Sequence, residues 1–372
     1  MKIPFVDLYS QYVSIKEEID EAMANVIRET AFIRGKYVKQ FEKDFEEKIG
    51  VKHCLSLANG TDAIYIALKM KGIGQGDEVI TVANSWISSS ETITQTGAKP
   101  VFVDIDDYFS IDADLIENHI TERTKAIVPV HLHGQSVDMD KIMAICKKHN
   151  LFLVEDTAQA HFTEYKGKFA GTMGDVGTFS FYPGKNLGAY GDAGCSITND
   201  SALVEKMRMY ANHGALIKHQ HHMEGINSRL DGLQAAILSV KLKYILQWTE
   251  SRRTLAKYYN KALGEIEEIQ TPLVRPETNH SYHVYAIKAQ QRDELEVNLK
   301  SMGIGTNRHY PIILPLMPAY EYLGGKKEDF PVAYKAQQEI LSLPMYPEMT
   351  TEMVDHISES IKEFYVKRSV TV

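Results

Sequence analysis

The chain has 372 residues, 44% of them hydrophobic and 24% charged, with a formal net charge of −8. This composition is typical of a folded globular protein, and the acidic balance excludes a general nucleic-acid binder, which needs a basic surplus. The length is sufficient for a large domain and a smaller one.

Nothing in the sequence indicates export or a membrane. No basic segment leads into an apolar run at the N-terminus, and no apolar run approaches the roughly 20 residues that span a bilayer. Cys54, Cys146 and Cys195 lack the close spacing of a zinc site or a disulfide framework. We therefore expect a cytoplasmic protein with neither a membrane nor a nucleic acid as partner.

The first predicted helix carries Ile15, Ile19, Met23 and Val26, whose spacing lines one helical face. Short apolar runs then alternate with helical stretches. The segment HCLSLANG predicts a strand that ends at Gly60, and TDAIYIALKMKG predicts the helix after it.

Four further apolar runs follow: EVITV, PVFVDI, AIVPVHL and LFLVED. Helical stretches such as VDMDKIMAICKKHN separate them. This alternation predicts βαβ units, and thus a mainly parallel sheet with helices on both faces. Ligands of such sheets bind beyond the carboxyl ends of the strands, so polar residues at those ends are the candidates for chemistry.

The C-terminal half begins with a predicted helix over residues 201–213, a polar loop, and a long helix from Leu233 to about Trp248. The remainder mixes helices with the strand-like run HVYAIKA, which indicates a smaller α+β domain. We place residues 1–245 in the large domain and residues 246–372 in the small one, although no linker composition marks the boundary.

Four features stand at predicted strand ends or loops. Asp156 closes the run LFLVED, where a carboxylate is costly unless paired; helix capping is the commoner role of such a residue. Lys185 lies among aromatic residues and glycines, where a desolvated amine can form a Schiff base. Gly60 and Thr61 join a strand to a helix whose N–H groups can hold a phosphate. Trp86 can stack on a flat ring or simply pack in the core.

Other familiar sites are missing from the sequence. It contains no GxxxxGK[ST], no GxGxxG after a strand, no HExxH and no GxSxG. We interpret His219, His221 and His222 as a solvated loop, and His131 and His133 as a polar strand end. No metal site is predicted.

The four features together meet the needs of one cofactor. Pyridoxal phosphate requires an amine for its aldehyde, a carboxylate for its pyridine nitrogen, a phosphate cradle and a flat neighbour for its ring. Each feature alone is weak, but their combination favours this cofactor.

Several motifs in fixed order resemble the DegT/DnrJ/EryC1/StrS family of sugar aminotransferases, which have the fold-type I architecture of pyridoxal-phosphate enzymes. The motifs are PFVDL (4–8), ANGTDAI (58–64), EDTAQAH (155–161), TFSFYPGKNLGAYGDAG (178–194), NSRLDGLQAAIL (227–238) and RHYP (308–311). The resemblance implies a large domain on a mainly parallel sheet and a smaller C-terminal α+β domain.

The resemblance also implies roles around the cofactor. Lys185 would bind the cofactor covalently and then move the proton, while Asp156 would keep the pyridine nitrogen protonated. Gln159 would hydrogen-bond the phenolic oxygen, and Trp86 would stack on the ring. The phosphate would be held by Gly60, Thr61, Ser180 and Asn227. In the family this asparagine comes from the neighbouring subunit, so we expect a homodimer with shared active sites.

The implied reaction transfers an amino group from glutamate to a nucleotide-linked keto sugar. Asp62 and His161 are similar to members that act at sugar carbon 3, which favours a dTDP-3-keto-6-deoxyhexose and deoxyaminosugar biosynthesis. The expected substrate contacts are Arg34, His161, Tyr182, Arg308, His309 and Tyr310. The chain departs from the family at PIILPLM, where Pro315 and Met317 replace a histidine and a glutamine.

Three alternatives differ in substrate or class. A UDP-linked 3-keto hexuronate would need an extra cation, for which Arg34 and Arg308 are available, although both can equally serve the diphosphate. A sugar 3-dehydratase would carry histidine in place of Lys185. A non-catalytic regulator of the same fold would be free to lose Asp156, Gln159 or Lys185, and all three are present.

Overall fold

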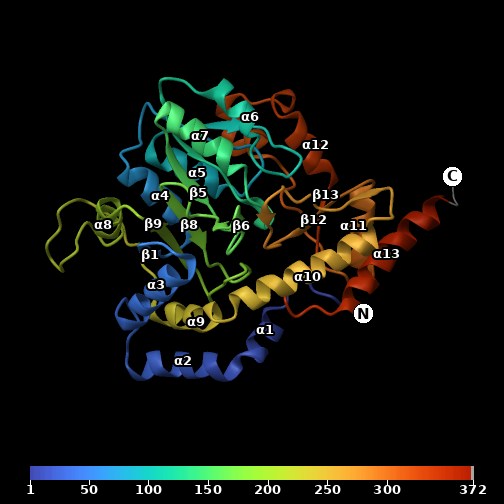
Figure 1. Ribbon diagram of the computed structural model, residues 1–372, viewed down its shortest axis with the longest axis horizontal. Helices are drawn as coiled ribbons and strands as arrows, with labels where there is room; N and C mark the ends of the chain where they lie inside the picture. Colours follow the sequence, from blue (N-terminus) through green and yellow to red (C-terminus); the bar gives the residue numbers. More distant parts are fainter. Residues whose placement is uncertain (370–372) are drawn as a thin grey trace.

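The computed structural model describes residues 1–369 and is built around a seven-stranded sheet (Figure 1). The strands lie in the order β1-β9-β8-β5-β4-β2-β3, and adjacent strands are parallel except in the two pairs that β9 forms. Their bounds are His53–Leu57 (β1), Glu78–Val82 (β2), Lys99–Val103 (β3), Thr124–Val128 (β4), Phe152–Asp156 (β5), Val176–Ser180 (β8) and Gly194–Thr198 (β9). The predicted mainly parallel sheet is confirmed.

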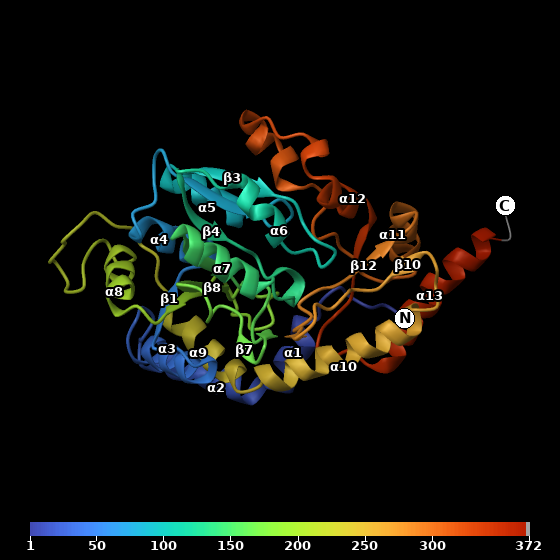
Figure 2. The same ribbon diagram turned by 45° about the horizontal axis from the view of Figure 1, so that its top comes forward.

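Helices cover both faces of this sheet (Figure 2). One face packs against α4 (Gly60–Met70), α5 (Ser88–Thr96) and α8 (Ser201–Tyr210). The other face packs against α3 (Lys36–Ile49) and α9 (Gly232–Leu242) near β1, and against α7 (Met139–His149) towards β3. The predicted α/β layering is therefore present.

The turn after β1 differs from its prediction. The strand ends at Leu57 rather than Gly60, because the side chain of Asn59 accepts a 2.7 Å hydrogen bond from the Asp62 N–H and caps the next helix. Gly60 is consequently the first residue of α4. This places its backbone at the N-terminus of a helix rather than in the sheet.

The N-terminal segment forms α1 (Leu8–Ser14) and α2 (Lys16–Arg28), and the buried Ile19 and Val26 lie on one face of α2, as predicted. The single long helix predicted from Leu233 is wrong. It divides into α9 and α10 (Ile245–Leu263), because the N–H groups of Lys243 and Tyr244 bond three residues back, to Val240 and Lys241, and tighten the turn.

The C-terminal part has its own core. A second sheet joins β10 (Ile269–Gln270), β12 (Tyr285–Ala289) and β13 (Ile340–Leu343), and it packs with α10, α11 (Arg292–Ser301) and α13 (Thr351–Ser369). Ile3 from the N-terminus is buried in this core. The division of the chain at residue 245 remains a prediction.

Smaller elements connect these layers. A three-stranded sheet joins β6 (Glu164–Tyr165), β7 (Lys168–Phe169) and β11 (Thr278–Asn279). The remaining helices are α6 (Ala113–Ile116), α12 (Pro331–Glu339) and the short 3₁₀ segments η1 (Glu117–His119), η2 (Leu132–Gly134), η3 (Leu314–Leu316), η4 (Pro318–Leu323) and η5 (Lys327–Asp329). None of the helices in residues 1–369 combines the length and apolarity of a membrane span.

Candidate active site

A cavity of about 640 Å³ opens at the carboxyl ends of β1, β2, β4, β5 and β8, and residues 307–311 contribute to its wall. This is the position at which parallel α/β sheets bind ligands. The predicted site residues that line it are Gly60, Thr61, Trp86, Asp156, Gln159, Ser180, Tyr182, Lys185, Arg308, His309 and Tyr310.

Lys185 lies in a tight loop after β8. Its N–H donates to the Tyr182 carbonyl at 2.8 Å, and the Ala189 N–H donates to the Phe181 carbonyl at 2.8 Å, so the loop folds back on itself. The side chain reaches the cavity, and burial lowers the pKa of its amine to about 8, an effect that Asp156 opposes. Roughly a tenth of such an amine is neutral at pH 7, against less than about a thousandth for an ordinary lysine.

Asp156 is the last residue of β5 and is 6% exposed. Burial raises the pKa of its carboxyl, while a hydrogen bond from the Ala158 N–H (3.1 Å) and the charge of Lys185 oppose the rise. The end of β5 and the loop after β8 thus present a carboxyl and an amine to one cavity. The two groups can interact with opposite ends of a single flat ligand.

Gln159 has a fixed side-chain orientation. Its Oε1 accepts from the His133 N–H at 2.8 Å, and its Nε2 donates to the Tyr310 hydroxyl at 2.8 Å. Burial raises the pKa of Tyr310, so its hydroxyl stays protonated. The Gln159 amide therefore has one N–H left to donate to a ligand, while its oxygen is already used.

Gly60, Thr61 and Ser180 form a cradle for an anion. The first N–H groups of α4 have no acceptor within the helix, and the helix dipole favours negative charge there. The Ser180 hydroxyl accepts from the Tyr182 N–H at 3.3 Å, which leaves its own proton to donate. A Cβ on Gly60 would lie 2.7 Å from the Ser180 Cβ, so only glycine fits here. These donors suit a phosphate group.

Two aromatic side chains stand at the mouth of the cavity. Trp86 is 60% exposed and Tyr182 is 58% exposed. The Trp86 ring centroid lies 6.0 Å from that of Tyr310. A tryptophan this exposed is not a core residue, and its position leaves a face available for stacking.

Two predicted contacts on the small-domain side are already engaged with the protein. The Arg308 guanidinium forms ion pairs with Asp293 (2.9 Å) and Glu296 of α11. The His309 ring bonds the Ser342 hydroxyl at 2.8 Å, and burial lowers its pKa to about 3. Arg308 therefore offers little unbalanced charge, and His309 is neutral.

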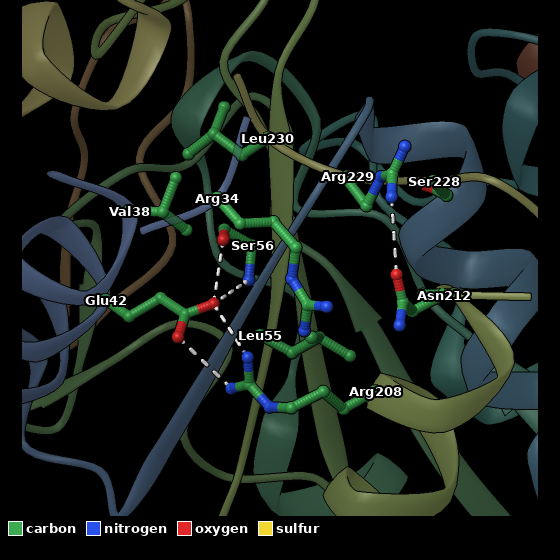
Figure 3. A pocket seen from close by; sticks show the side chains of 11 residues that line it. Arg34, Val38, Glu42, Leu55, Ser56, Arg208, Asn212, Ser228, Arg229 and Leu230 are labelled. Atoms are coloured by element: carbon green, nitrogen blue, oxygen red, sulfur yellow. Dashed lines mark hydrogen bonds and ion pairs between the residues drawn. The ribbon is translucent and has the colours of Figure 1, made fainter. Parts of the chain in front are cut away.

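Arg34 is not brought to this cavity. It lines a small second cavity with Glu42, Arg208 and Arg229, where Glu42 pairs with Arg208 and accepts from Ser56 (Figure 3). Burial and the two neighbouring arginines lower the pKa of Arg34. Within one chain, it is separate from the Lys185 cavity.

His161 and Asn227 also lie outside the lining of the Lys185 cavity. The His161 ring is fully buried, with its centroid 5.4 Å from that of Phe179 and 5.7 Å from that of Phe181. Burial lowers its pKa to about 3. In this conformation it contacts aromatic core residues rather than a ligand. Asn227 forms an isolated bridge with Asn212.

Sequence reasoning missed several residues of the lining: Asn59, Ser85, Ser88, Asp192 and Asn307. Asn59 could have been found as the capping residue of ANGTD, and Asn307 as the neighbour of RHYP. Within residues 1–369, no cluster of histidine, cysteine and acidic side chains is arranged to hold a metal.

A buried amine, a carboxyl and an anion cradle at the strand ends of this fold define a pyridoxal-phosphate-dependent aminotransferase. The model of the DegT/DnrJ/EryC1/StrS aminotransferase family matches residues 13–362, and the chain belongs to this family. It is a sugar aminotransferase, as the resemblance implied.

Relatives and solved structures cover nearly the whole chain. The protein is 47% identical to the "Pleiotropic regulatory protein" of Geobacillus stearothermophilus, with 98% of this chain and 99% of that protein covered. It is 41% identical to the dTDP-3-amino-3,6-dideoxy-alpha-D-galactopyranose transaminase of Aneurinibacillus thermoaerophilus, with 97% and 99% covered. The crystal structure of S. venezuelae DesV matches with a TM-score of 0.95 at 37% identity and 98% coverage of both chains. Other relatives are named as aminotransferases of UDP-linked sugars.

Proposed function

We propose that the enzyme transfers the amino group of glutamate to carbon 3 of a dTDP-linked 3-keto-6-deoxyhexose, for deoxyaminosugars of surface polysaccharides such as lipopolysaccharide. The observation that carries this proposal is the charge of the cavity. Lys185 and Arg308 are its only lysine and arginine side chains within residues 1–369, and carboxylates of α11 already neutralise Arg308. A cavity with so little unbalanced positive charge suits a sugar that carries no carboxylate.

Lys185 and Asp156 carry the proton chemistry in this proposal. Pyridoxal phosphate, when bound, supplies an electron sink for the carbon that loses a proton. The neutral amine of Lys185 takes the proton from the α carbon of the amino donor and later delivers one to sugar carbon 3. Asp156 holds a proton at the ring nitrogen.

The remaining contacts orient the cofactor. The Gln159 amide donates to the phenolic oxygen, and Trp86 covers the ring and excludes water. The N–H groups of Gly60 and Thr61 and the Ser180 hydroxyl bind the phosphate. Tyr182, His309 and Tyr310 stand where a sugar would enter, and Arg308 can reach the diphosphate only by sharing its charge with α11.

We also propose a homodimer in which Asn227 of one copy completes the phosphate site of the other. Asn227 does not line the cavity of its own chain. Residues 32 and 33 lie beside the segment that follows Asn227, because the Gly232 N–H donates to the Phe32 carbonyl at 2.7 Å. Both carry exposed apolar side chains: Phe32 is 43% exposed and Ile33 is 57% exposed. Exposed apolar groups beside an unused polar one favour an interface with a second copy.

One observation supports a second substrate, a UDP-linked 3-keto hexuronate. In the second cavity, neither Arg34 nor Arg229 forms an ion pair with a carboxylate of residues 1–369. This cavity adjoins the segment that carries Asn227, so a dimer could present these cations to the neighbouring site, where a sugar carboxylate would pair with them.

The test mixes the purified protein with glutamate and a panel of nucleotide-linked keto sugars and identifies the product by mass. We expect amination of the dTDP-linked 3-keto-6-deoxyhexose. Amination of the uronate alone would replace the first substrate by the second. If the parent protein aminates none of these sugars and so behaves like its Lys185→Ala variant, the result would support the hypothesis of a non-catalytic regulator. The name of the Geobacillus relative suggests such a role.

A further inference from the structure

Lys241 is a buried cation that the proposed chemistry does not use. It lies near the end of α9 and is 1% exposed. Its ammonium lies 4.3 Å from the centre of the Tyr190 ring and donates a 2.8 Å hydrogen bond to the Gly188 carbonyl. A buried lysine is costly, and an apolar side chain at this position would avoid that cost. Its contact with Gly188 therefore calls for an explanation.

Gly188 belongs to the loop that carries Lys185. A Cβ at Gly188 would lie 2.3 Å from the Pro183 carbonyl oxygen, so the loop closes tightly on itself at this residue. Because Lys185 lies between Pro183 and Gly188, a shift of the Gly188 peptide must also displace the Lys185 backbone.

A second side chain of α9 holds the same loop. Gln234 accepts a 2.8 Å hydrogen bond from the Tyr190 N–H through its Oε1. Gln234 and Lys241 are seven residues apart and therefore lie on the same face of the helix. One binds an N–H and the other a C=O of the loop, two residues apart. These two hydrogen bonds from α9 thus fix the position and the orientation of the backbone at residues 188–190, after Lys185.

A carboxyl group influences the charge of Lys241 electrostatically. Glu348, between β13 and α13, opposes the effect of burial, which lowers the pKa of Lys241 to about 8. The Glu348 oxygens are buried without a hydrogen bond of good geometry, although Gln11 lies beside them. Arg252, which donates to the Met345 carbonyl at 2.6 Å, faces the same carboxylate. Burial raises the pKa of the Glu348 carboxyl in turn.

We propose that Lys241 is a positioning residue for Lys185: its ammonium holds the Gly188 carbonyl and so sets where the Lys185 amine stands in the cavity. The inference rests on the proposed role of Lys185 as the lysine that binds the cofactor. Lys241 itself does not line the Lys185 cavity.

The test uses cofactor-free protein and pyridoxal phosphate. The rate of the covalent link to Lys185 is followed by visible absorbance and verified by borohydride reduction and peptide mass. Lys241→Met removes the donor and should slow the link about ten-fold, as expected for a lost hydrogen bond from a charged group. Lys241→Arg keeps a charged donor and should retain at least half the parent rate. Lys257→Met, a control at an exposed position of α10, should match the parent.

A second readout separates positioning from general damage. In the Lys185→Ala background, non-covalent affinity for pyridoxal phosphate should be unchanged by Lys241→Met, because the cradle and Asp156 do not contact Lys241. Should the Met variant fail to fold, Lys241→Gln takes its place.

The proposal is overturned by any of three results. These are a covalent rate for the Met variant within two-fold of the parent, an equal loss in the Arg variant, or a parallel loss of non-covalent affinity. If the parent protein forms no covalent link at Lys185, the proposed function is refuted instead. This result would be known before any Lys241 variant is made.

Discussion

The floor and the mouth of the cavity are built differently. The floor consists of buried groups at strand ends, such as Asp156 and Gln159, which are 6% and 4% exposed and held by backbone hydrogen bonds. The mouth consists of exposed aromatic side chains, Trp86 and Tyr182, and of Arg308, whose charge is already paired. Asp156 and Gln159 come from one chain and are enclosed by it, whereas the mouth is open to solvent. We infer that the floor carries the shared chemistry and the mouth the choice of sugar.

The largest expected effect is on the floor. Asp156→Asn should bind pyridoxal phosphate nearly as well as the parent but lose amination about a hundred-fold or more, because a neutral amide cannot keep the ring nitrogen protonated. Amination would be measured by product mass and affinity by titration. Turnover within a few-fold of the parent would make Asp156 a structural residue.

The second largest effect is expected at the anion cradle of Gly60, Thr61 and Ser180. In Gly60→Ala the added methyl would lie 2.7 Å from the Ser180 Cβ, so α4 or β8 must shift and the phosphate donors with it. We expect cofactor affinity to fall about ten- to a hundred-fold, by the loss of one or two hydrogen bonds to a charged group. Gly74→Ala serves as the control, because Gly74, like Gly60, has no positive φ, and the added atom would lie 3.4 Å from its nearest neighbour, the Thr96 carbonyl oxygen. Equal affinity of the parent and Gly60→Ala for pyridoxal phosphate would show that this cradle does not bind the phosphate.

Asn227 tests whether a second copy completes the phosphate site. Asn227→Ala should weaken cofactor binding about ten-fold if one copy serves the other. Mixing two inactive proteins, Lys185→Ala and Asn227→Asp, should then restore up to half the native activity of each heterodimer, because one of its two sites is wholly native. No recovery after demonstrated subunit exchange would confine Asn227 to its own chain.

The pH dependence of cofactor binding gives the smallest effect. Only the neutral amine attacks the aldehyde, and burial lowers the pKa of Lys185 to about 8, so the neutral form becomes abundant at lower pH than for ordinary lysine. The rate of the covalent link should rise about ten-fold from pH 7 to pH 9 and then level off. A rise of about a hundred-fold without levelling would indicate an unperturbed amine.

The sequence placed Asp156 at the end of a strand and Gly60 and Lys185 in the segments that follow strands, and all three line one cavity. Their roles toward the cofactor remain predictions. The sequence alone was insufficient where segments far apart in the chain determine the surroundings of a residue. His161 shares its motif with Asp156 but is enclosed by Phe179 and Phe181, and no local pattern reveals that.

The break between α9 and α10 has a similar origin. Residues around Lys243 and Tyr244 suit a continuous helix, yet both side chains bond Glu18 of α2, a residue more than two hundred positions earlier in the chain. The place of Arg34 was equally hidden, since its cavity forms only when α3 and α8 come together.

We expect Lys185 to bind the cofactor covalently at the floor of the cavity. The protein loaded with pyridoxal phosphate would be reduced with borohydride, digested, and searched by mass for the modified peptide. We expect the cofactor on Lys185 alone, with Lys185→Ala unlabelled and the buried Lys241 unmodified in both. A label on any other lysine, or the same label yield in Lys185→Ala, would contradict the account.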